Sequence, residues 1–199
     1  MRRRGTEFDI PAYYHIYNRG AGKRKIFIDA RDKQKFIALM ARYLDENVYI
    51  RGDGMPYEKS DAKVLAYCLM GNHFHLLLYQ ESNTDDIRRF VKSLTSAYAR
   101  YYNLRHKNSG YLFEGAFRAK RITSDMYLQH ITRYIHLNPR TYLTYRWSSL
   151  PEYIGVRHTA WVYAQQGNEL SAGQYLAFLE SYEDRAAELR AIKKELEIN

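Results

Sequence analysis

Cysteine is almost absent from this sequence, since Cys68 is the only one among 199 residues. A lone thiol excludes an intramolecular disulfide and a zinc site built on cysteines. No apolar run approaches the roughly 20 residues that span a bilayer, and the basic first residues lack the apolar segment of a signal peptide. Glycine-rich phosphate loops of the Walker or dinucleotide type are also missing. We therefore expect a cytoplasmic protein that contacts no membrane and uses no nucleotide cofactor.

Basic residues and tyrosines, in contrast, are in excess. Lys and Arg number 31 against 22 for Asp and Glu, which gives a net charge of +9, and there are 20 tyrosines. A positive balance favours polyanions such as nucleic acid, and tyrosine rings stack on unpaired bases. The composition is therefore typical of a protein that binds single-stranded nucleic acid. The alternative is a basic protein with a tyrosine-rich core.

Hydrophobic periodicity and turn signals predict seven elements ahead of the C-terminal tail. Their order, β-α-β-β-α-β-α, predicts an α+β ferredoxin-like sandwich, an antiparallel sheet with helices on one face. The last helix begins at its cap Ser124 and ends by Asn138, because a residue before proline resists the α conformation. The expected elements are a strand at 12–20, a helix from about 29 to 47, strands at 62–70 and 73–80, a helix from 83 or 84 to about 104, one or two strands within 111–123, and the helix from 124.

Two histidines, His73 and His75, lie one residue apart in the apolar stretch MGNHFHLLL. Alternate side chains of a strand share a face, so both imidazoles point one way while Phe74, Leu76 and Leu78 point the other. Two imidazoles on adjacent pleats can share one divalent cation and leave positions open for substrate oxygens. The alternative is a pair of surface histidines on a half-exposed strand.

Five segments with recognisable motifs follow one another along the chain: YHIYNRGAGKRKIF, MGNHFHLLL, GYLFEGAFRAKRI, RYIHLNP and WSSLPEYIG. With these segments the chain resembles the HUH single-strand DNA endonucleases, in which two histidines flank a bulky hydrophobic residue. More narrowly, it resembles the REP-associated tyrosine transposases of the IS200-like family, over roughly residues 8–160. The resemblance implies a catalytic domain at 1–140 and a C-terminal extension at 141–199. Within that extension, residues 146–155 predict a packed loop, and the helix formers and periodic apolar positions at about 171–196 predict a helix.

The resemblance also implies a nucleophile and a third metal ligand. Tyr134 and Asn138 are four residues apart, which places them close to one face of their helix. By resemblance, Tyr134, the first residue of YIHLNP, is the catalytic tyrosine, and Asn138 completes a metal site with His73 and His75. The alternative is that Tyr134 is a core aromatic of an amphipathic helix.

The implied reaction is metal-dependent cleavage and joining of single-stranded DNA. A divalent cation, Mg²⁺ or Mn²⁺, would polarise the scissile phosphate. Tyr134 would attack in line and leave a 5′-phosphotyrosine and a free 3′-OH, which can reverse the step or join a new strand. Two alternatives stay open, a hairpin-binding protein of this fold that does not cleave and a metal-dependent hydrolase of another kind. His130 and His136 are competing ligands or acid–base groups, although we expect surface or base-stacking roles for both.

The partner implied by the resemblance is hairpin DNA beside a short single-stranded tetranucleotide, and we expect a monomer rather than a dimer. Three basic groups are candidate DNA contacts, although each could be a solvated charge run. They are an arm of Arg2, Arg3 and Arg4, a loop with Arg19, Lys23, Arg24 and Lys25, and the residues Arg118, Lys120 and Arg121. We expect Glu114 to pair with Arg118, and Tyr98, Tyr101 and Tyr102 either to stack on bases or to fill the core.

Overall fold

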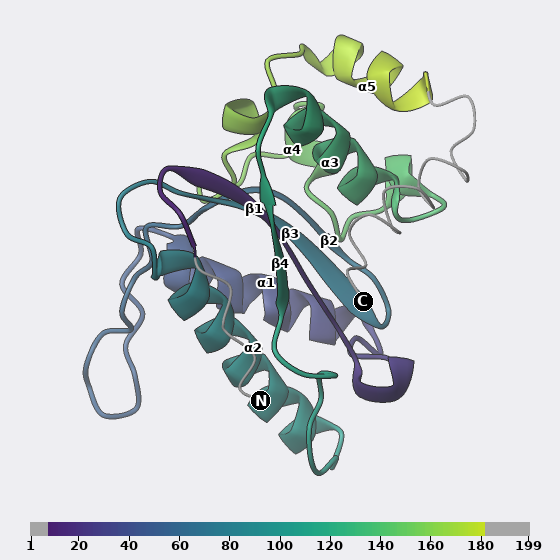
Figure 1. Ribbon diagram of the computed structural model, residues 1–199. Helices are drawn as coiled ribbons and strands as arrows, with labels where there is room; N and C mark the ends of the chain where they lie inside the picture. The colour runs from purple at the N-terminus through teal and green to yellow at the C-terminus, as the bar shows by residue number, and fades with distance from the viewer. Residues whose placement is uncertain (1–7, 182–199) are drawn as a thin grey trace, which may run out of the picture.

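The computed structural model of the protein describes residues 8–181 and contains one four-stranded sheet. Its strands are β1 Ala12–Arg19, β2 Lys63–Leu69, β3 His73–Gln80 and β4 Arg118–Ile122. All neighbours are antiparallel, and their order is β2-β3-β1-β4. Each helical crossover therefore connects two strands that have a third strand between them, as in a ferredoxin-like sandwich. The predicted fold class is confirmed (Figure 1).

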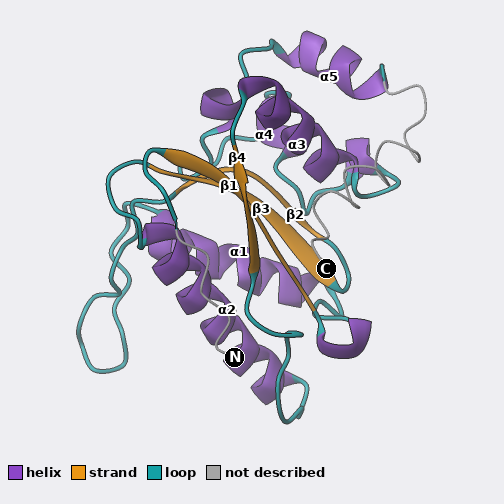
Figure 2. Cartoon of the chain, viewed as in Figure 1, coloured by secondary structure: helices purple, strands orange, loops and turns teal. Residues whose placement is uncertain are grey.

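Helices cover both faces of this sheet. They are α1 Ala30–Leu44, α2 Asp86–Arg105, α3 Asp125–Leu137, α4 Leu150–Tyr153 and α5 Ala172–Glu180, with 3₁₀ turns at Ala21–Lys23, Tyr142–Thr144 and Ala164–Gly167. Helices were expected on one face of the sheet only, and α1 and α2 do share one face. α3 and α4, however, lie over the opposite face, with α5 beyond them (Figure 2). None of the helices within residues 8–181 has the length and apolar character to cross a membrane.

The pleat of β3 sends its side chains into two different cores. Phe74, Leu76 and Leu78 are fully buried in the cluster that includes residues of α1 and α2, as the alternation of a strand predicts. Leu77 faces the other way, into a second cluster formed with α3, α4 and α5. His73 and His75 alternate onto this second face, so the histidine pair lies on the side of the sheet that α3 covers.

The segment that precedes and begins α4 covers the outer edge of β2. The Leu69 N–H donates to the Trp147 carbonyl at 3.0 Å, and the Ser149 N–H donates to the Tyr67 carbonyl at 3.0 Å. A strand edge that is paired within its own chain cannot pair with a second chain. The tail therefore closes one side of the sheet.

The tail also shares a core with the region before it. The packed loop expected at 146–155 contains α4, and both α4 and α5 contribute to the cluster under α3. The regions predicted as 1–140 and 141–199 are thus joined by a common apolar cluster. The helix expected at about 171–196 corresponds to α5, and its part beyond residue 181 lies outside the described residues.

A buried carboxylate joins the start of α1 to the end of α2. Asp32 has no exposed surface, accepts the Ile28 N–H at 2.8 Å, and lies 3.0 Å from the His106 ring. It also forms an ion pair with Arg105. Burial by itself raises the pKa of this carboxyl, but its hydrogen-bond donors outweigh burial, and the resulting pKa lies below the usual range.

The Asp32→Asn variant is expected to unfold more easily at pH 7, by about 2–3 kcal/mol, because Arg105 and His106 lose their charged acceptor. The folded pKa is lowered, so the carboxylate contributes fully above about pH 4, and this contribution is lost as the pH falls through the folded pKa. Urea denaturation at pH 7 and at about pH 3 measures both effects. The control is Asp53→Asn, which breaks an exposed pair with Arg51 and should cost less than about 0.5 kcal/mol. Equal losses in the two variants at pH 7 would contradict the prediction.

Candidate active site

α3 brings an aromatic ring to the histidine pair. The Ser124 side chain caps the helix by accepting the N–H of residue 127, and the helix then runs over β2 and β3. Its Tyr134 is only 4% exposed, and the ring stands edge-on to His75 with centroids 5.3 Å apart. The rings of His73 and His75 are themselves 5.0 Å apart. Side chains from β3 and α3, far apart in the sequence, therefore meet on one face of the sheet.

Asn138, at the C-terminal end of α3, reaches the other histidine. Its Oδ1 lies 3.4 Å from His73 Nε2. Two ligands at right angles on one cation, with bonds of about 2.1 Å, are about 3.0 Å apart, so these atoms need little movement to share an ion. Among residues 8–181, no three His, Cys, Asp or Glu side chains gather in a metal-binding group. The available donors are two imidazoles and an amide oxygen, a set that fits Mn²⁺ or Mg²⁺ with positions left open for substrate.

His15 on β1 belongs to the same cluster, although nothing in its sequence motif singles it out. It is 3% exposed, and its Nε2 lies 2.9 Å from His75 Nδ1. One ring donates and the other accepts, which orients the His75 ring. Burial first, and then the charge of Lys120, lowers the pKa of His15 to about 3, so this imidazole is neutral at pH 7. Only the register of β1 against β3 shows that His15 faces the pair.

Two of the three basic candidates on β4 share the face of the histidine pair. Arg118 and Lys120 are cross-strand partners of Tyr17 and His15, whose rings contact the pair. Arg121 alternates to the opposite face, where its guanidinium lies 2.7 Å from an Asp9 oxygen. Strand alternation therefore places the first two basic side chains beside the candidate site and directs the third away from it.

The arginines of the loop after β1 fasten that loop to the segment before β4. Arg19 forms a two-pronged ion pair with Glu114, and the Glu114 N–H donates to the Arg19 carbonyl at 2.9 Å. The backbone bridge thus holds Glu114 beside Arg19, whereas a pair of Glu114 with Arg118 stays a prediction. Hydrogen bonding to Arg19 lowers the pKa of Glu114, and Arg118 adds only a weaker field. Arg24 donates to the backbone oxygens of residues 111 and 112.

Two lysines of the same loop are exposed, and two buried tyrosines of α2 hydrogen-bond to the backbone of the loop. Lys23 and Lys25 both face solvent. Tyr98 donates its hydroxyl to the Ile26 carbonyl at 2.5 Å, and Tyr102 donates to the Lys25 carbonyl at 3.1 Å. These two tyrosines therefore pack in the core and support the loop from there. The candidate contacts Arg2, Arg3 and Arg4 lie outside the described residues.

His136 is buried inside the second core and joins three elements of it. Its Nδ1 lies 2.7 Å from the Tyr175 hydroxyl, and its Nε2 lies 2.8 Å from Ser149 Oγ. Burial lowers its pKa to about 3. The surface role expected for His136 is wrong, because α4 and α5 cover this side of α3. His130 lies six residues earlier on α3, with Nδ1 2.9 Å from an Arg133 nitrogen.

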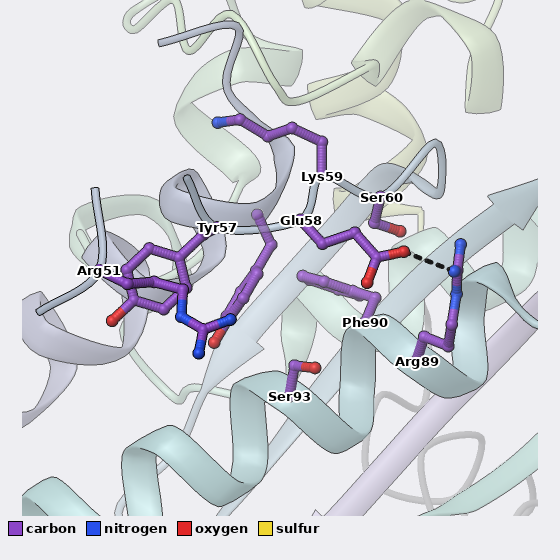
Figure 3. Close-up of a pocket in the computed structure, with 9 residues that line it drawn as sticks. Arg51, Tyr57, Glu58, Lys59, Ser60, Arg89, Phe90 and Ser93 are labelled. Carbon is purple, nitrogen blue, oxygen red and sulfur yellow. Dashed lines mark hydrogen bonds and ion pairs between the residues drawn. The ribbon is translucent and has the colours of Figure 1, made fainter. Parts of the chain in front are cut away.

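A separate pocket lies on the side of the sheet covered by α1 and α2 (Figure 3). It is bordered by the end of α1, the segment after it and the first turns of α2. Its Arg89 lies 2.7 Å from a Glu58 oxygen. Lys59 donates to backbone oxygens at the end of α1. These charges are already matched within the chain, and the histidine pair faces the other side of the sheet.

Comparison with known proteins connects this site to a family. Residues 55–138 match the family model described as "Transposase IS200 like". The match includes His73, His75, Tyr134 and Asn138. A search of curated proteins gave no match.

Structural comparison also found two solved structures. A REP-associated tyrosine transposase bound to a REP hairpin has a TM-score of 0.57 at 10% identity, covering 81% of this chain and 97% of that one. A putative transposase from Deinococcus radiodurans R1 has a TM-score of 0.41 at 17% identity, covering 66% of this chain and 92% of that one. The first likeness extends the shared fold beyond the segment that the family model matches.

Proposed function

This chain belongs to the IS200-like transposase family, and on that premise we propose that it cuts and rejoins single-stranded DNA next to a hairpin through a covalent link to Tyr134. The observation that carries the proposal is the meeting of four side chains on one sheet face. Tyr134 stands edge-on to His75, and His73 lies within 3.4 Å of Asn138. A phenol beside two imidazoles and an amide oxygen suits phosphoryl transfer, because the phenol can attack phosphorus and the other groups can hold a cation.

His73, His75 and Asn138 are the residues that would hold a divalent cation. When bound, Mg²⁺ or Mn²⁺ would polarise the scissile phosphate and offset charge in the transition state. His15 keeps the His75 ring oriented through the 2.9 Å contact between their nitrogens, a type of support that is worth about 10–100-fold in metal affinity at other sites. Because His15 is buried and neutral, it adds no positive charge that would repel the ion.

Tyr134 supplies the nucleophile. Its Oη would form a bond to phosphorus while the bond from phosphorus to O3′ breaks, so that the phenol loses a proton and the departing 3′ oxygen gains one. The products are a 5′-phosphotyrosine and a free 3′-OH. The covalent link keeps the energy of the phosphodiester, so a 3′-OH from the same or another strand can reverse the step. Packing against His75 and His15 fixes the position of the ring, which lowers the entropic part of the barrier.

DNA would approach over β4 and the loop after β1. Arg118 and Lys120 share the face of the site, and the exposed Lys23 and Lys25 lie at the end of β1 next to it. We propose these four as the phosphate contacts of the described region, with the arm of Arg2, Arg3 and Arg4 as a further candidate. A hairpin is proposed as the partner because the protein of similar fold was captured with one. The covered edge of β2 supports a monomer.

Removal of divalent metal is expected to abolish formation of a covalent protein–DNA product. The substrate is a hairpin with a single-stranded flank, labelled at its 3′ end, because the strand retained on Tyr134 carries that end. With Mn²⁺, a labelled band should migrate with the protein after SDS denaturation, EDTA should eliminate it, and added Mn²⁺ should restore it. Labelled cleavage products without an adduct would indicate a hydrolase. Hairpin binding with neither product would indicate a binding protein, and either result would overturn the proposal.

A further inference from the structure

Asn72 connects the loop after β1 to the first histidine of the pair. Its Nδ2 donates to the Lys23 carbonyl at 3.2 Å, and its Oδ1 lies 2.7 Å from His73 Nδ1. A backbone carbonyl can only accept, so the amide nitrogen must face Lys23 and the amide oxygen must face His73. The orientation of this side-chain amide is therefore determined by its surroundings.

The lengths of two contacts determine the tautomer of His73. Both ring nitrogens face an amide oxygen, but Nδ1 lies 2.7 Å from Asn72 Oδ1, a normal hydrogen-bond length, whereas Nε2 lies 3.4 Å from Asn138 Oδ1, which is too long for a strong bond. The single proton of the neutral ring is therefore on Nδ1. In the neutral imidazole, Nε2 then presents its lone pair, and it does so toward Asn138 Oδ1 at 3.4 Å. Two acceptor atoms that face each other at this distance are arranged to receive a cation between them. A histidine ligand whose other nitrogen donates to a fixed acceptor is the usual support of a protein metal site.

The loop that supplies the Lys23 carbonyl is itself held in one shape. The Gly20 N–H donates to the Asn72 carbonyl at 2.9 Å, and the Ile26 N–H donates to the Gly71 carbonyl at 2.9 Å. A Cβ on Gly20 would come within 2.2 Å of the Arg24 carbonyl oxygen, so only glycine fits there. Lys23 has a left-handed backbone conformation, with φ 61°. In this conformation its carbonyl faces the Asn72 amide. The loop after β1 and the turn between β2 and β3, which contains Gly71 and Asn72, thus form one hydrogen-bonded unit.

We propose that Asn72 is a positioning residue that holds His73 in its Nδ1-protonated tautomer and couples cation binding at His73 to the loop that carries Lys23 and Lys25. This inference rests on the proposed function, in which His73 binds the cation and the lysines contact DNA. The loop shape that presents the lysines also supplies the carbonyl that orients Asn72. DNA phosphate on the loop and metal on His73 therefore favour the same arrangement.

The test compares Asn72→Ala, Asn72→Asp and the control Asn47→Ala, an exposed asparagine whose amide bonds only within its own turn. Long-range ¹H–¹⁵N spectra of the metal-free proteins, at a pH where imidazole is neutral, report the His73 tautomer. We expect an Nδ1–H ring in the parent, in the control and in Asn72→Asp, which keeps the acceptor. We expect a shift toward Nε2–H in Asn72→Ala. An Nε2–H ring in the parent, or an unchanged ring in Asn72→Ala, would overturn the proposal.

Mn²⁺ binding, followed by electron paramagnetic resonance, gives a second readout. Asn72→Ala should bind Mn²⁺ about 10- to 100-fold more weakly than the parent, whereas Asn72→Asp should bind within a few fold of it. Added hairpin DNA should tighten Mn²⁺ binding in the parent and do so less in Asn72→Asp, which has lost the bond to Lys23. Equal tightening in both would refute the coupling. A parent that binds no Mn²⁺ refutes the metal site of the proposed function, whereas the tautomer measurement still decides the role of Asn72.

Discussion

A Tyr134→Phe variant is expected to form no covalent protein–DNA product and to cut a labelled hairpin at least about 10³-fold more slowly than the parent. The substitution removes one oxygen and keeps the ring. Tyr134 is 4% exposed and packs edge-on against His15 and His75, so phenylalanine fills the same space and the fold should persist. The loss therefore reports on the nucleophile and not on packing. Single-turnover cleavage with Mn²⁺ measures the rate, and SDS-denatured samples show the adduct.

The control for this experiment is Tyr79→Phe. Tyr79 lies on β3 and shares a face with His75, but it is four residues further along the strand. Its ring packs on Tyr13 with centroids 4.7 Å apart. It is far enough along the strand to take no part in the proposed reaction, so its variant should cut at the parental rate. If Tyr134→Phe also cuts at the parental rate, another group is the nucleophile and the proposed roles on α3 must be reassigned.

A His73→Ala variant is expected to lose cutting by at least about 10²-fold while it binds the hairpin within a few fold of the parent. Cutting should fail because the cation loses the ligand nearest to Asn138. Binding should persist because phosphate contacts, which do not use His73, supply most of the affinity of a DNA-binding protein. Fluorescence anisotropy without metal measures binding, and the cleavage assay measures the rate.

The matched control is His158→Ala, which removes an exposed imidazole and should change neither quantity. If binding of His73→Ala falls together with cutting, while the control is unaffected, the histidine pair is structural. His73 is only half-buried, in contrast to the fully buried His136, so loss of the fold is not the expected outcome. Thermal unfolding of the variant checks this directly.

Local patterns of the sequence predicted much of this molecule. Alternation in HFHLLL placed Phe74, Leu76 and Leu78 in one core and both histidines on the other face, because a strand repeats every two residues. Spacing of four placed Tyr134 and Asn138 together on α3, because a helix repeats every 3.6 residues. Ser124 and Pro139 marked the limits of that helix. Each of these features depends on residues that are neighbours along the chain.

Tertiary structure alone decided the rest. His15 meets His75 because of the register of β1 against β3, and Glu114 pairs with Arg19 because two distant segments are bridged. His136 is buried because the tail folds over α3. Sequence periodicity determined which side of a strand or helix a residue occupies. Which elements lie against that side depended on packing between segments dozens of residues apart, where apolar burial and backbone pairing act together.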